Sequence, residues 1–470
     1  MINKVIVIIY KQEKNTMKDK RHSFSSSLGF VLAAAGSAVG LGNIWRFPYL
    51  CAKYGGGIFL IVYILLALTF GYTMIIAETA IGRYTKKSPV GAFNSISNNK
   101  MMGLGGWINA IIPILIVPYY SVIGGWVCKY LYEYITNDVN VIAGDTFFTD
   151  FITDGIVSEI WFIVFAALVM IVIFMGVEGG IERVSKMVMP VLVVIAVIIC
   201  VYSVTRPGAL EGVKYLFVPN FQQFSIMTIV TAMGQMFYSL SIAMGILITF
   251  GSYVKKEVSI EGSTKQVEFF DTIIAILASL MIIPAVFSFY HGDESMLKAG
   301  PSLMFITMPQ IFASMGLGKI IGILFFAFVL FAAVTSAIAL TESAVSTFAD
   351  EFKWSRKKGS IIMIVIMLLL GSLSSLGNGP LSSVTIIGMQ FLDFFDFLTN
   401  SVMMPVAAFA TCVLITRFMG IEKLEAEVEQ DGHPFKRKGI FSFMIRFLCP
   451  VFVVIILVSA ILNVFGIISM

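Results

Sequence analysis

The sequence predicts an all-α membrane protein that crosses the bilayer eleven times. Hydrophobic residues make up 58% of its 470 positions and charged residues only 13%, about half the charged share of a soluble domain. A soluble protein with so few charges could not cover its surface with polar groups. The apolar residues also gather in eleven runs, and roughly 20 such residues are what a helix needs to cross about 30 Å of hydrocarbon.

The eleven runs follow one another along the whole chain. In order, the spans are expected near residues 27–50, 57–82, 105–130, 158–176, 187–204, 226–252, 268–290, 319–348, 360–377, 383–415 and 442–468. Pro and Gly occur inside several runs, but transmembrane helices tolerate both. Every run is therefore kept as a span, and the odd number places the two chain ends on opposite sides of the membrane.

The distribution of Lys and Arg predicts the orientation. With the N-terminus inside, the inner side holds 25 of these residues and the outer side holds 7. Cytoplasmic connections of membrane proteins carry such an excess of positive charge. The outer loop 131–160 agrees, because it contains six acidic residues and no Lys or Arg. The sequence thus predicts a cytoplasmic N-terminus and an extracellular C-terminus.

Residues 1–22 form the expected cytoplasmic tail. It contains the apolar stretch Val5 to Tyr10, which is too short to span a membrane and is not followed by a signal-peptide cleavage site. One interpretation is an interfacial stub. The interpretation we favour is an upstream read-through, with translation starting at Met17.

Composition argues against several classes of protein. The five Cys lie in or beside apolar runs and the three His lie in separate loops, so neither a disulfide framework nor a His-rich metal site is expected. The net charge of +4 does not indicate a nucleic-acid-binding face. We find no nucleophile–base or metal constellation of an enzyme, and no short filter motif of a selective channel.

The first span contains an irregular segment, AAAGSAVGLGNIWRFP, from Ala33 to Pro48. Three Gly fall within seven positions and are followed by Asn43 and Arg46. The Gly pattern alone is equally consistent with close helix packing through small residues. An Arg near the end of a span, however, needs water or a carboxylate beside it. The combination therefore favours a break with a functional role.

The sixth span contains a second irregular segment, GQMFYSLSIAMG, from Gly234 to Gly245. Two Ser and two Gly interrupt an otherwise apolar helix. A broken helix exposes backbone N–H and C=O groups, which is tolerated at mid-membrane only where they line a cavity. Half-helix N-termini favour an anionic group and unwound carbonyls favour a small cation. Because the two breaks lie five spans apart, they predict a 5+5 inverted-repeat transporter fold with discontinuous helices 1 and 6.

These and further motifs resemble the neurotransmitter:sodium symporter family. The matching segments are GSAVGLGNIWRFPY (Gly36 to Tyr49), YGGGIF (Tyr54 to Phe59), ETAIGRY (Glu78 to Tyr84), PYY (Pro118 to Tyr120), GQMFYSLS (Gly234 to Ser241) and AAVTSAIAL (Ala332 to Leu340). The resemblance extends over roughly residues 21–470. It is to the bacterial amino-acid branch with a leucine-transporter-like fold, and eleven spans match the bacterial members.

The resemblance implies two sodium sites. The first would consist of the Ala38 carbonyl with Asn43, Ser239 and Asp271. The second would consist of the carbonyls of Gly36, Val39 and Ala332 with the hydroxyls of Thr335 and Ser336. All of these ligands are oxygen atoms, as a hard cation requires. For the two hydroxyls, hydrogen bonding back to their own helix is the alternative reading.

Asp271 departs from many animal members of the family, which have Asn here and a bound chloride nearby. Its neighbours in FFDTIIAIL are apolar, so the carboxylate does not belong to a solvated face. Such a charge near mid-membrane is costly unless a cation compensates it. We therefore expect Asp271 to replace chloride, so that two Na⁺ ions and no chloride are the expected ions.

Gly40 points to an amino acid as the substrate. In monoamine carriers of the family the matching residue is an Asp that pairs with the amine, whereas Gly leaves room for a substrate carboxylate. The donors to that carboxylate would be the amides of Leu41 and Gly42 and the hydroxyl of Tyr120. The remaining substrate-binding residues would be Ser37, Ile116, Tyr238, Ser241, Met244, Ser336 and Leu340. Met is flexible and polarizable, so the choice between a leucine-like and an aromatic side chain stays open.

The resemblance also implies an outer gate. Arg46 would lie just above the substrate, with Tyr238 as an aromatic lid. A gapless alignment puts Thr385 where the family has the acidic partner of this Arg. Asp393 and Asp396 are expected about two to three turns deeper, either as a functional pair or as a lining of the outer vestibule, and the partner of Arg46 stays open.

An inner gate is implied at the cytoplasmic side. Arg21 and Asp350 match the family's gate pair, and Phe24 stands where a Trp often sits. Exposed ion pairs contribute little by themselves. Such a pair therefore matters only if it forms in one conformation and breaks in the other.

Together these features imply sodium-coupled import of a neutral, hydrophobic or aromatic L-amino acid by alternating access, in the plasma membrane of a bacterium. The alternatives are a proton-coupled or exchange-type amino-acid carrier of the same fold and a non-transporting sensor. One transporter domain is expected, with spans 1–6 in residues 23–255, spans 7–10 in 256–416, and a cytoplasmic loop and span 11 in 417–470. The expected partners are the small-molecule amino acid and the lipid bilayer, with no nucleic acid, and a homodimer stays open.

Overall fold

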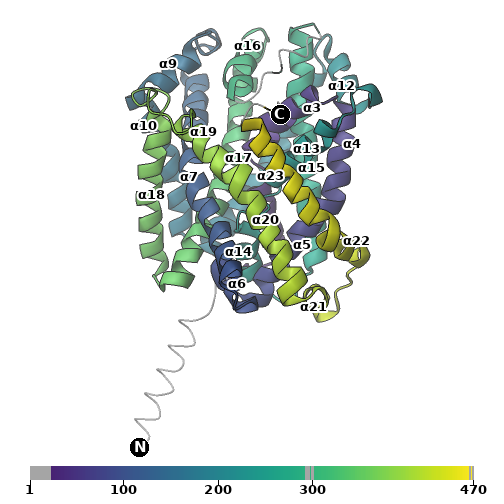
Figure 1. Ribbon diagram of the computed structural model, residues 1–470. Coiled ribbons are helices and arrows are strands. Elements are labelled where there is room, and N and C mark those ends of the chain that lie inside the picture. The colour runs from purple at the N-terminus through teal and green to yellow at the C-terminus, as the bar shows by residue number, and fades with distance from the viewer. Residues whose placement is uncertain (1–22, 292–296, 298–300, 465–466, 468–470) are drawn as a thin grey trace, which may run out of the picture.

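The computed structural model describes residues 23–291, 297, 301–464 and 467 of the chain. Within them the chain is a bundle of helices (Figure 1), and only two isolated β-bridges occur. The short segment Val5 to Tyr10, the proposed start at Met17 and the gate residue Arg21 lie outside the described residues.

Nine helical segments of the described chain are long and apolar enough to cross a membrane. Five of them are single α-helices: Lys100–Thr136 (α7), Gly155–Phe174 (α10), Ile260–Phe289 (α15), Gly318–Phe352 (α17) and Arg356–Leu376 (α18). The segment Gly57–Thr85 contains α4 (Gly57–Leu66) and α5 (Tyr72–Thr85), and Val177–Val204 contains α11 (Arg183–Val204). The segment Phe391–Met419 contains α19 (Phe391–Asp396) and α20 (Met404–Val413), and Lys438–Asn463 contains α22 (Lys438–Phe443) and most of α23 (Cys449–Val464). Several of them extend past the expected span ends, because helical hydrogen bonding continues beyond the hydrocarbon layer.

The two remaining spans are broken, as the sequence predicts. Span 1 consists of α2 (Ser27–Ala38) and the segment Gly42–Lys53, which ends in α3 (Phe47–Lys53), and the two parts are bent by 54°. Span 6 consists of α13 (Ile226–Ser239) and α14 (Ile246–Tyr253), with Leu240 to Gly245 between them. These breaks and the nine long helices agree with the eleven-span, discontinuous fold.

Span 10 begins later than the sequence predicts. The expected start was residue 383, but residues 377–390 form a loop and the helix begins at Phe391. Val384 and Ile386 make this loop as apolar as a helix end, so hydropathy gives no signal at the boundary. Ile387 and Gly388 have positive φ angles of 54° and 76°, which turn the chain back before the helix starts.

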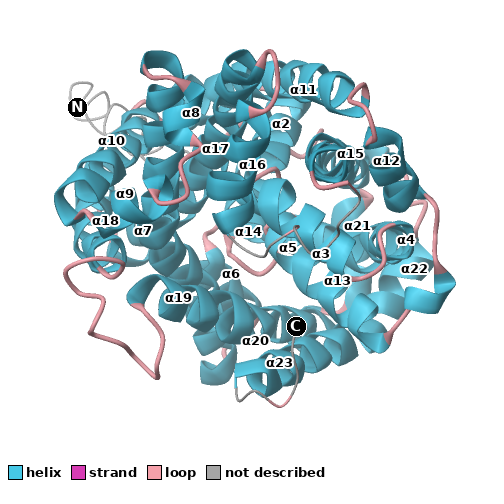
Figure 2. Cartoon of the chain, turned by 90° about the horizontal axis from the view of Figure 1, so that it is seen from above, coloured by secondary structure: helices cyan, strands magenta, loops and turns pink. Residues whose placement is uncertain are grey.

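Short helices cover the two ends of the bundle. They are α6 (Pro89–Ile96), α8 (Val139–Ile142), α9 (Phe147–Thr153), α12 (Ala209–Phe217), α16 (Met308–Ala313) and α21 (Ile421–Val428). Seen from above, α14 lies near the middle of the bundle, whereas α10 and α18 lie at its periphery (Figure 2).

Small residues let the broken helices approach the bundle core. In α2 the sequence AAAGSA is fully buried, and a Cβ at Gly36 would lie only 3.2 Å from the Cβ of Thr335 on α17. Small side chains of this kind allow backbones to pack closely within a membrane. The first break is thereby held directly against α17.

Candidate functional site

A cavity lies where the two broken helices meet. It contains ≈ 340 Å³ of atom-free space. All eleven residues expected to bind the substrate line it: Ser37, Gly40, Leu41, Gly42, Ile116, Tyr120, Tyr238, Ser241, Met244, Ser336 and Leu340. Ala38, Asn43 and Ile246 complete the lining. The structure therefore brings together residues from spans 1, 3, 6 and 8.

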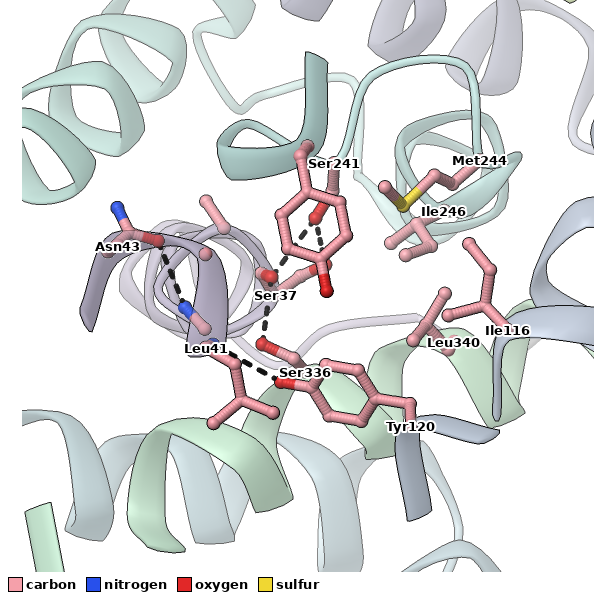
Figure 3. A pocket seen from close by; sticks show the side chains of 14 residues that line it. Ser37, Leu41, Asn43, Ile116, Tyr120, Ser241, Met244, Ile246, Ser336 and Leu340 are labelled. Atoms are coloured by element: carbon pink, nitrogen blue, oxygen red, sulfur yellow. Dashed lines mark hydrogen bonds between the residues drawn. The ribbon is translucent and has the colours of Figure 1, made fainter. Parts of the chain in front are cut away.

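The cavity has a polar side and an apolar side (Figure 3). Hydroxyl groups and the unwound backbone of span 1 gather on one side, around Ser37, Ser336 and Tyr120. On the other side lie Ile116, Met244, Ile246 and Leu340. None of the lining residues carries a charge, so a molecule that fits the apolar side needs an uncharged side chain.

The break in span 1 takes backbone groups beside the cavity out of helical hydrogen bonding. The helix α2 ends where Val39 adopts an extended conformation, with ψ of 99°. Beyond it, the Gly40 N–H donates to the side-chain oxygen of Asn43 (3.2 Å) and the Leu41 N–H donates to the Tyr120 hydroxyl (3.4 Å). The carbonyl of Gly42 accepts a bond from the Gln235 amide at 2.9 Å. Side chains thus support the unwound backbone in place of helical bonds.

The break in span 6 uses unusual backbone conformations. Ser241 and Ala243 have positive φ angles of 54° and 59°, and Gly245 has one of 68°. For residues other than Gly this conformation costs about 1 kcal/mol or more. Two contacts oppose that cost: the Ser241 hydroxyl donates to the Ser37 carbonyl (3.0 Å), and the Ala243 N–H donates to the buried carboxylate of Glu78 (2.8 Å).

Three of the four residues expected at the first sodium site, Asn43, Ser239 and Asp271, form one buried cluster, whereas Ala38 lines the cavity. In Asp271, Oδ1 accepts hydrogen bonds from the Ser239 hydroxyl (2.5 Å) and the Asn43 amide (2.7 Å), and Oδ2 accepts one from the Tyr63 hydroxyl (2.8 Å). The side chain is 0% exposed. All three donors are neutral, and no Lys or Arg of the described chain lies within ion-pair distance. The oxygen-rich cluster with its uncompensated charge fits a hard cation.

The residues expected at the second sodium site also lie together. The Ser336 hydroxyl lies 3.0–3.3 Å from the carbonyl oxygens of Gly36, Ser37 and Val39. Thr335 instead donates back to its own helix, to the carbonyls of Phe331 and Ala332 at 3.1 Å each. Thr335 therefore bonds within its own helix in this conformation, which is the alternative to sodium binding named above. Ser336 instead connects α17 to the break in span 1.

Above the central cavity lies a second, outer cavity of ≈ 920 Å³ of atom-free space. Tyr238 lines both cavities, and its role as a lid between them stays a prediction. Arg46 lines the outer cavity, with its guanidinium carbon 5.8 Å from the centre of the Tyr238 ring. The cation therefore lies above the aromatic side chain, as the sequence predicts.

The same outer cavity is lined by Asp396, one of the two acids between which, with no partner as a third possibility, the sequence left the partner of Arg46 open. Thr385, at the aligned position, is an exposed loop residue, and Asp393 is also exposed. The expectation that these two acids lie two to three turns deeper is wrong, because the helix starts only at Phe391 and both belong to its first two turns. Asp396 accepts hydrogen bonds from Asn400 (2.6 Å) and Tyr119 (3.3 Å), which aim it toward the cavity.

We expect the Asp396→Asn variant to transport about tenfold more slowly than the parent protein. Closure of the outer cavity would bring this carboxylate to Arg46, and a charge-assisted hydrogen bond contributes about 1.5–3 kcal/mol. The measurement is initial uptake of a labelled amino acid into proteoliposomes. Asp393→Asn, which removes an exposed acid of the same helix, is the matched control. Equal rates for both variants would show that Asp396 has no part in closure.

On the inner side the structure places the gate residues in packed surroundings. Phe24 is 2% exposed and its ring contacts Phe30, Phe250 and Tyr253. Asp350 accepts a hydrogen bond from the Ser88 N–H at 2.7 Å. Its expected partner, Arg21, lies outside the described residues, so the gate pair itself stays a prediction.

Sequence reasoning missed several residues at these sites. Tyr63 supports Asp271 from span 2, Ile246 extends the apolar wall of the cavity, and Gln235 and Glu78 are hydrogen-bonded to the backbone of the two breaks. On α17, Glu342 accepts two hydrogen bonds from Arg356 (2.5 and 2.8 Å). Glu342 could have been noticed, since a carboxylate within an apolar span needs a partner. Tyr63 and Ile246 stand in ordinary apolar runs and carry no such signal.

Comparisons with known proteins find similar proteins along nearly the whole chain. The sequence model described as the sodium:neurotransmitter symporter family matches residues 21–156 and 150–467. An uncharacterized sodium-dependent transporter of Bacillus subtilis (strain 168), YhdH, is 33% identical over 457 residues, which cover 96% of this chain and 99% of that protein. An uncharacterized sodium-dependent transporter of Haemophilus influenzae is 30% identical, covering 94% and 99%.

A solved structure is also similar to the chain. The crystal structure of MhsT in complex with L-phenylalanine is 37% identical in sequence and superimposes with a TM-score of 0.84. The match covers 94% of this chain and 100% of that one. The fold is thus shared over nearly the full length of both proteins.

Proposed function

Because the chain belongs to the sodium:neurotransmitter symporter family and is a sodium-dependent transporter, we propose that it imports a neutral, hydrophobic L-amino acid together with Na⁺. The observation that carries this proposal is the central cavity, which combines unwound backbone, hydroxyl groups and an apolar wall without a single charged lining residue. Import proceeds by alternating access and does not require chloride.

The polar side of the cavity suits the main-chain groups of an amino acid. The N–H groups of Leu41 and Gly42 begin the second half of span 1, where the helix dipole favours a carboxylate. The Tyr120 hydroxyl, 3.4 Å from the Leu41 nitrogen, supplies a further donor. The carbonyl oxygens that end α2 would accept hydrogen bonds from the substrate ammonium group.

The apolar side suits a hydrophobic side chain. Ile116, Met244, Ile246 and Leu340 offer carbon and sulfur atoms and no ionisable group. A charged substrate side chain would lose its hydration there without a partner, which is strongly unfavourable. The bound L-phenylalanine of the similar MhsT structure supports an aromatic side chain among those accepted.

The two oxygen-rich clusters, around Asp271 and around Ser336, support two sodium sites and chloride independence. Asp271 supplies a full negative charge where its neighbours supply neutral oxygen atoms. A cation bound there is neutralised by the protein itself, so a separate anion is unnecessary. Each Na⁺ entering against −100 mV contributes about 2.3 kcal/mol, with about 1.4 kcal/mol more for each tenfold concentration gradient. Two ions would sustain accumulation of well over a hundredfold.

The test is uptake of labelled leucine, phenylalanine and tryptophan into proteoliposomes that contain the purified full chain. We expect uptake with an inward sodium gradient, no uptake when choline replaces sodium, and unchanged uptake when gluconate replaces chloride. Persistence of exchange in choline would indicate an exchange-type or proton-coupled carrier. Sodium-dependent binding without uptake would indicate a sensor, and a requirement for chloride would contradict the role given to Asp271.

A further inference from the structure

A groove runs along the outside of the bundle between α10 and α18. Its outer part, with ≈ 880 Å³ of space, is lined by Asp154, Gly155, Ile156, Glu159, Ile160, Ile163, Leu376 and Pro380. Its inner part, with ≈ 630 Å³, is lined by Ile163, Ala166, Ala167, Met170, Ile171, Phe174, Ile364, Met367 and Leu368. Ile163 lines both parts, so they meet at this residue. The two helices, α10 and α18, lie at the periphery of the bundle (Figure 2).

The floor of the groove is firmly closed. Behind it, the hydroxyls of Ser158 and Ser375 are hydrogen-bonded at 3.1 Å. A Cβ at Gly371 would lie 2.2 Å from the buried ring of Phe162, so the two helices touch directly at this level. The groove is therefore a fixed indentation of the surface that faces lipid and not an entrance to the transport cavity.

The two ends of the groove differ in chemistry. From Ile160 to Phe174 its α10 wall is apolar over about 21 Å, more than the roughly 15 Å of one leaflet's hydrocarbon. The outer end carries the carboxylates of Asp154 and Glu159. Glu159 accepts one hydrogen bond, from Ser372, and its other carboxylate oxygen is buried without a partner. No Lys or Arg lines either part of the groove.

We propose that this groove binds a phospholipid with a primary ammonium headgroup, phosphatidylethanolamine, with one acyl chain along α10. The ammonium group has a positive charge and three hydrogen-bond donors, and the outer end of the groove offers it two carboxylates with no Lys or Arg in the lining to compete for them. The acyl chain packs against the isoleucines that line the groove, among them Ile160, Ile163 and Ile171. Anionic lipids are disfavoured, since two carboxylates at the outer end would repel them. Choline lipids have the positive charge but no N–H to donate.

The test uses the purified full chain in detergent, titrated with phosphatidylethanolamine, phosphatidylcholine or phosphatidylglycerol of identical acyl chains, and native mass spectrometry of the bound lipid. We expect the ethanolamine lipid to bind about tenfold more tightly than either of the others, the size expected for a charge-assisted hydrogen bond. Glu159→Gln should remove this preference. Glu211→Gln, at an exposed acid of α12, is the matched control and should retain it.

A second variant tests the apolar part of the groove. Ile163→Trp fills the point where the two parts join and should abolish retention of all three lipids. The matched control is Ile198→Trp, because Ile163 and Ile198 are 46% and 47% exposed but only the first lies in the groove. Equal binding of the three lipids by the parent protein would overturn the proposal, as would retention of lipid by Ile163→Trp. A dimer lost in Ile163→Trp would identify a second copy of the chain as the occupant and would also overturn it.

Discussion

Replacement of Asp271 by Asn is expected to raise the sodium concentration needed for half-maximal substrate binding by about 100-fold or more. The carboxylate is 0% exposed and is surrounded only by neutral donors, so a bound cation is its natural counter-charge. Removing one partner from a buried ion pair costs about 3–5 kcal/mol, and 1.4 kcal/mol corresponds to tenfold. This makes Asp271 the residue on which sodium coupling depends most.

The measurement is equilibrium binding of a labelled amino acid at increasing sodium concentration, once with gluconate and once with chloride as the anion. The parent protein should respond equally in both salts, and the variant should bind better in chloride because the anion replaces the lost charge. Asp393→Asn is the control, since that acid is exposed. Tyr63→Phe removes one 2.8 Å hydrogen bond to the same carboxylate and should cause a smaller shift. An unchanged sodium requirement in Asp271→Asn, with the protein folded, would contradict the assignment.

Replacement of Gly40 by Asp is expected to abolish uptake of amino acids. A Cβ at this position would lie 2.8 Å from the Ser336 hydroxyl oxygen and 3.3 Å from the Tyr120 hydroxyl oxygen. The new carboxylate would therefore occupy the place proposed for the carboxylate of the substrate, and it would repel it. Two like charges in a buried site cost several kcal/mol, which corresponds to a loss of affinity of more than about 100-fold.

Gly40→Asn separates the effect of charge from that of size. It adds nearly the same volume and the same Cβ contact with Ser336 but no charge, so it should lose less affinity than Gly40→Asp. Gly234→Asp is a second control, because no atom lies within 4 Å of a Cβ there and the residue faces the outer cavity. Equal loss in Gly40→Asp and Gly40→Asn would show that only space matters at this position, and the carboxylate would then have to bind elsewhere.

Much of the fold could be predicted because hydropathy is a local property. Each span must transfer about 20 residues from water into lipid, and that free energy is a sum over its own side chains. The breaks near Gly40 and Ser241 could be predicted for a related reason, since Gly, Ser and Asn gather there within spans that are otherwise apolar. Asp271 was visible as a single charge in such a run.

The start of span 10 and the partner of Arg46 could not be predicted in the same way. The loop before Phe391 contains Val384 and Ile386, which are as apolar as the helix that follows, so its boundary is set by backbone conformation. Because the helix begins at Phe391 and Thr385 lies in the loop before it, the gapless alignment does not place Thr385 at the start of the helix. Asp396 lines the same cavity as Arg46 because α19 and the second half of span 1 both border it.

The sequence by itself determined how many times the chain crosses the membrane, where two helices break and which residues supply oxygen atoms and N–H groups at those breaks. The tertiary structure alone decided which distant side chains support them: Tyr63 beneath Asp271, Glu78 beside Ala243 and Asp396 in the same cavity as Arg46. The physical reason is that entry into lipid is a property of each segment, whereas the pairing of polar groups depends on how helices far apart in the chain pack against one another.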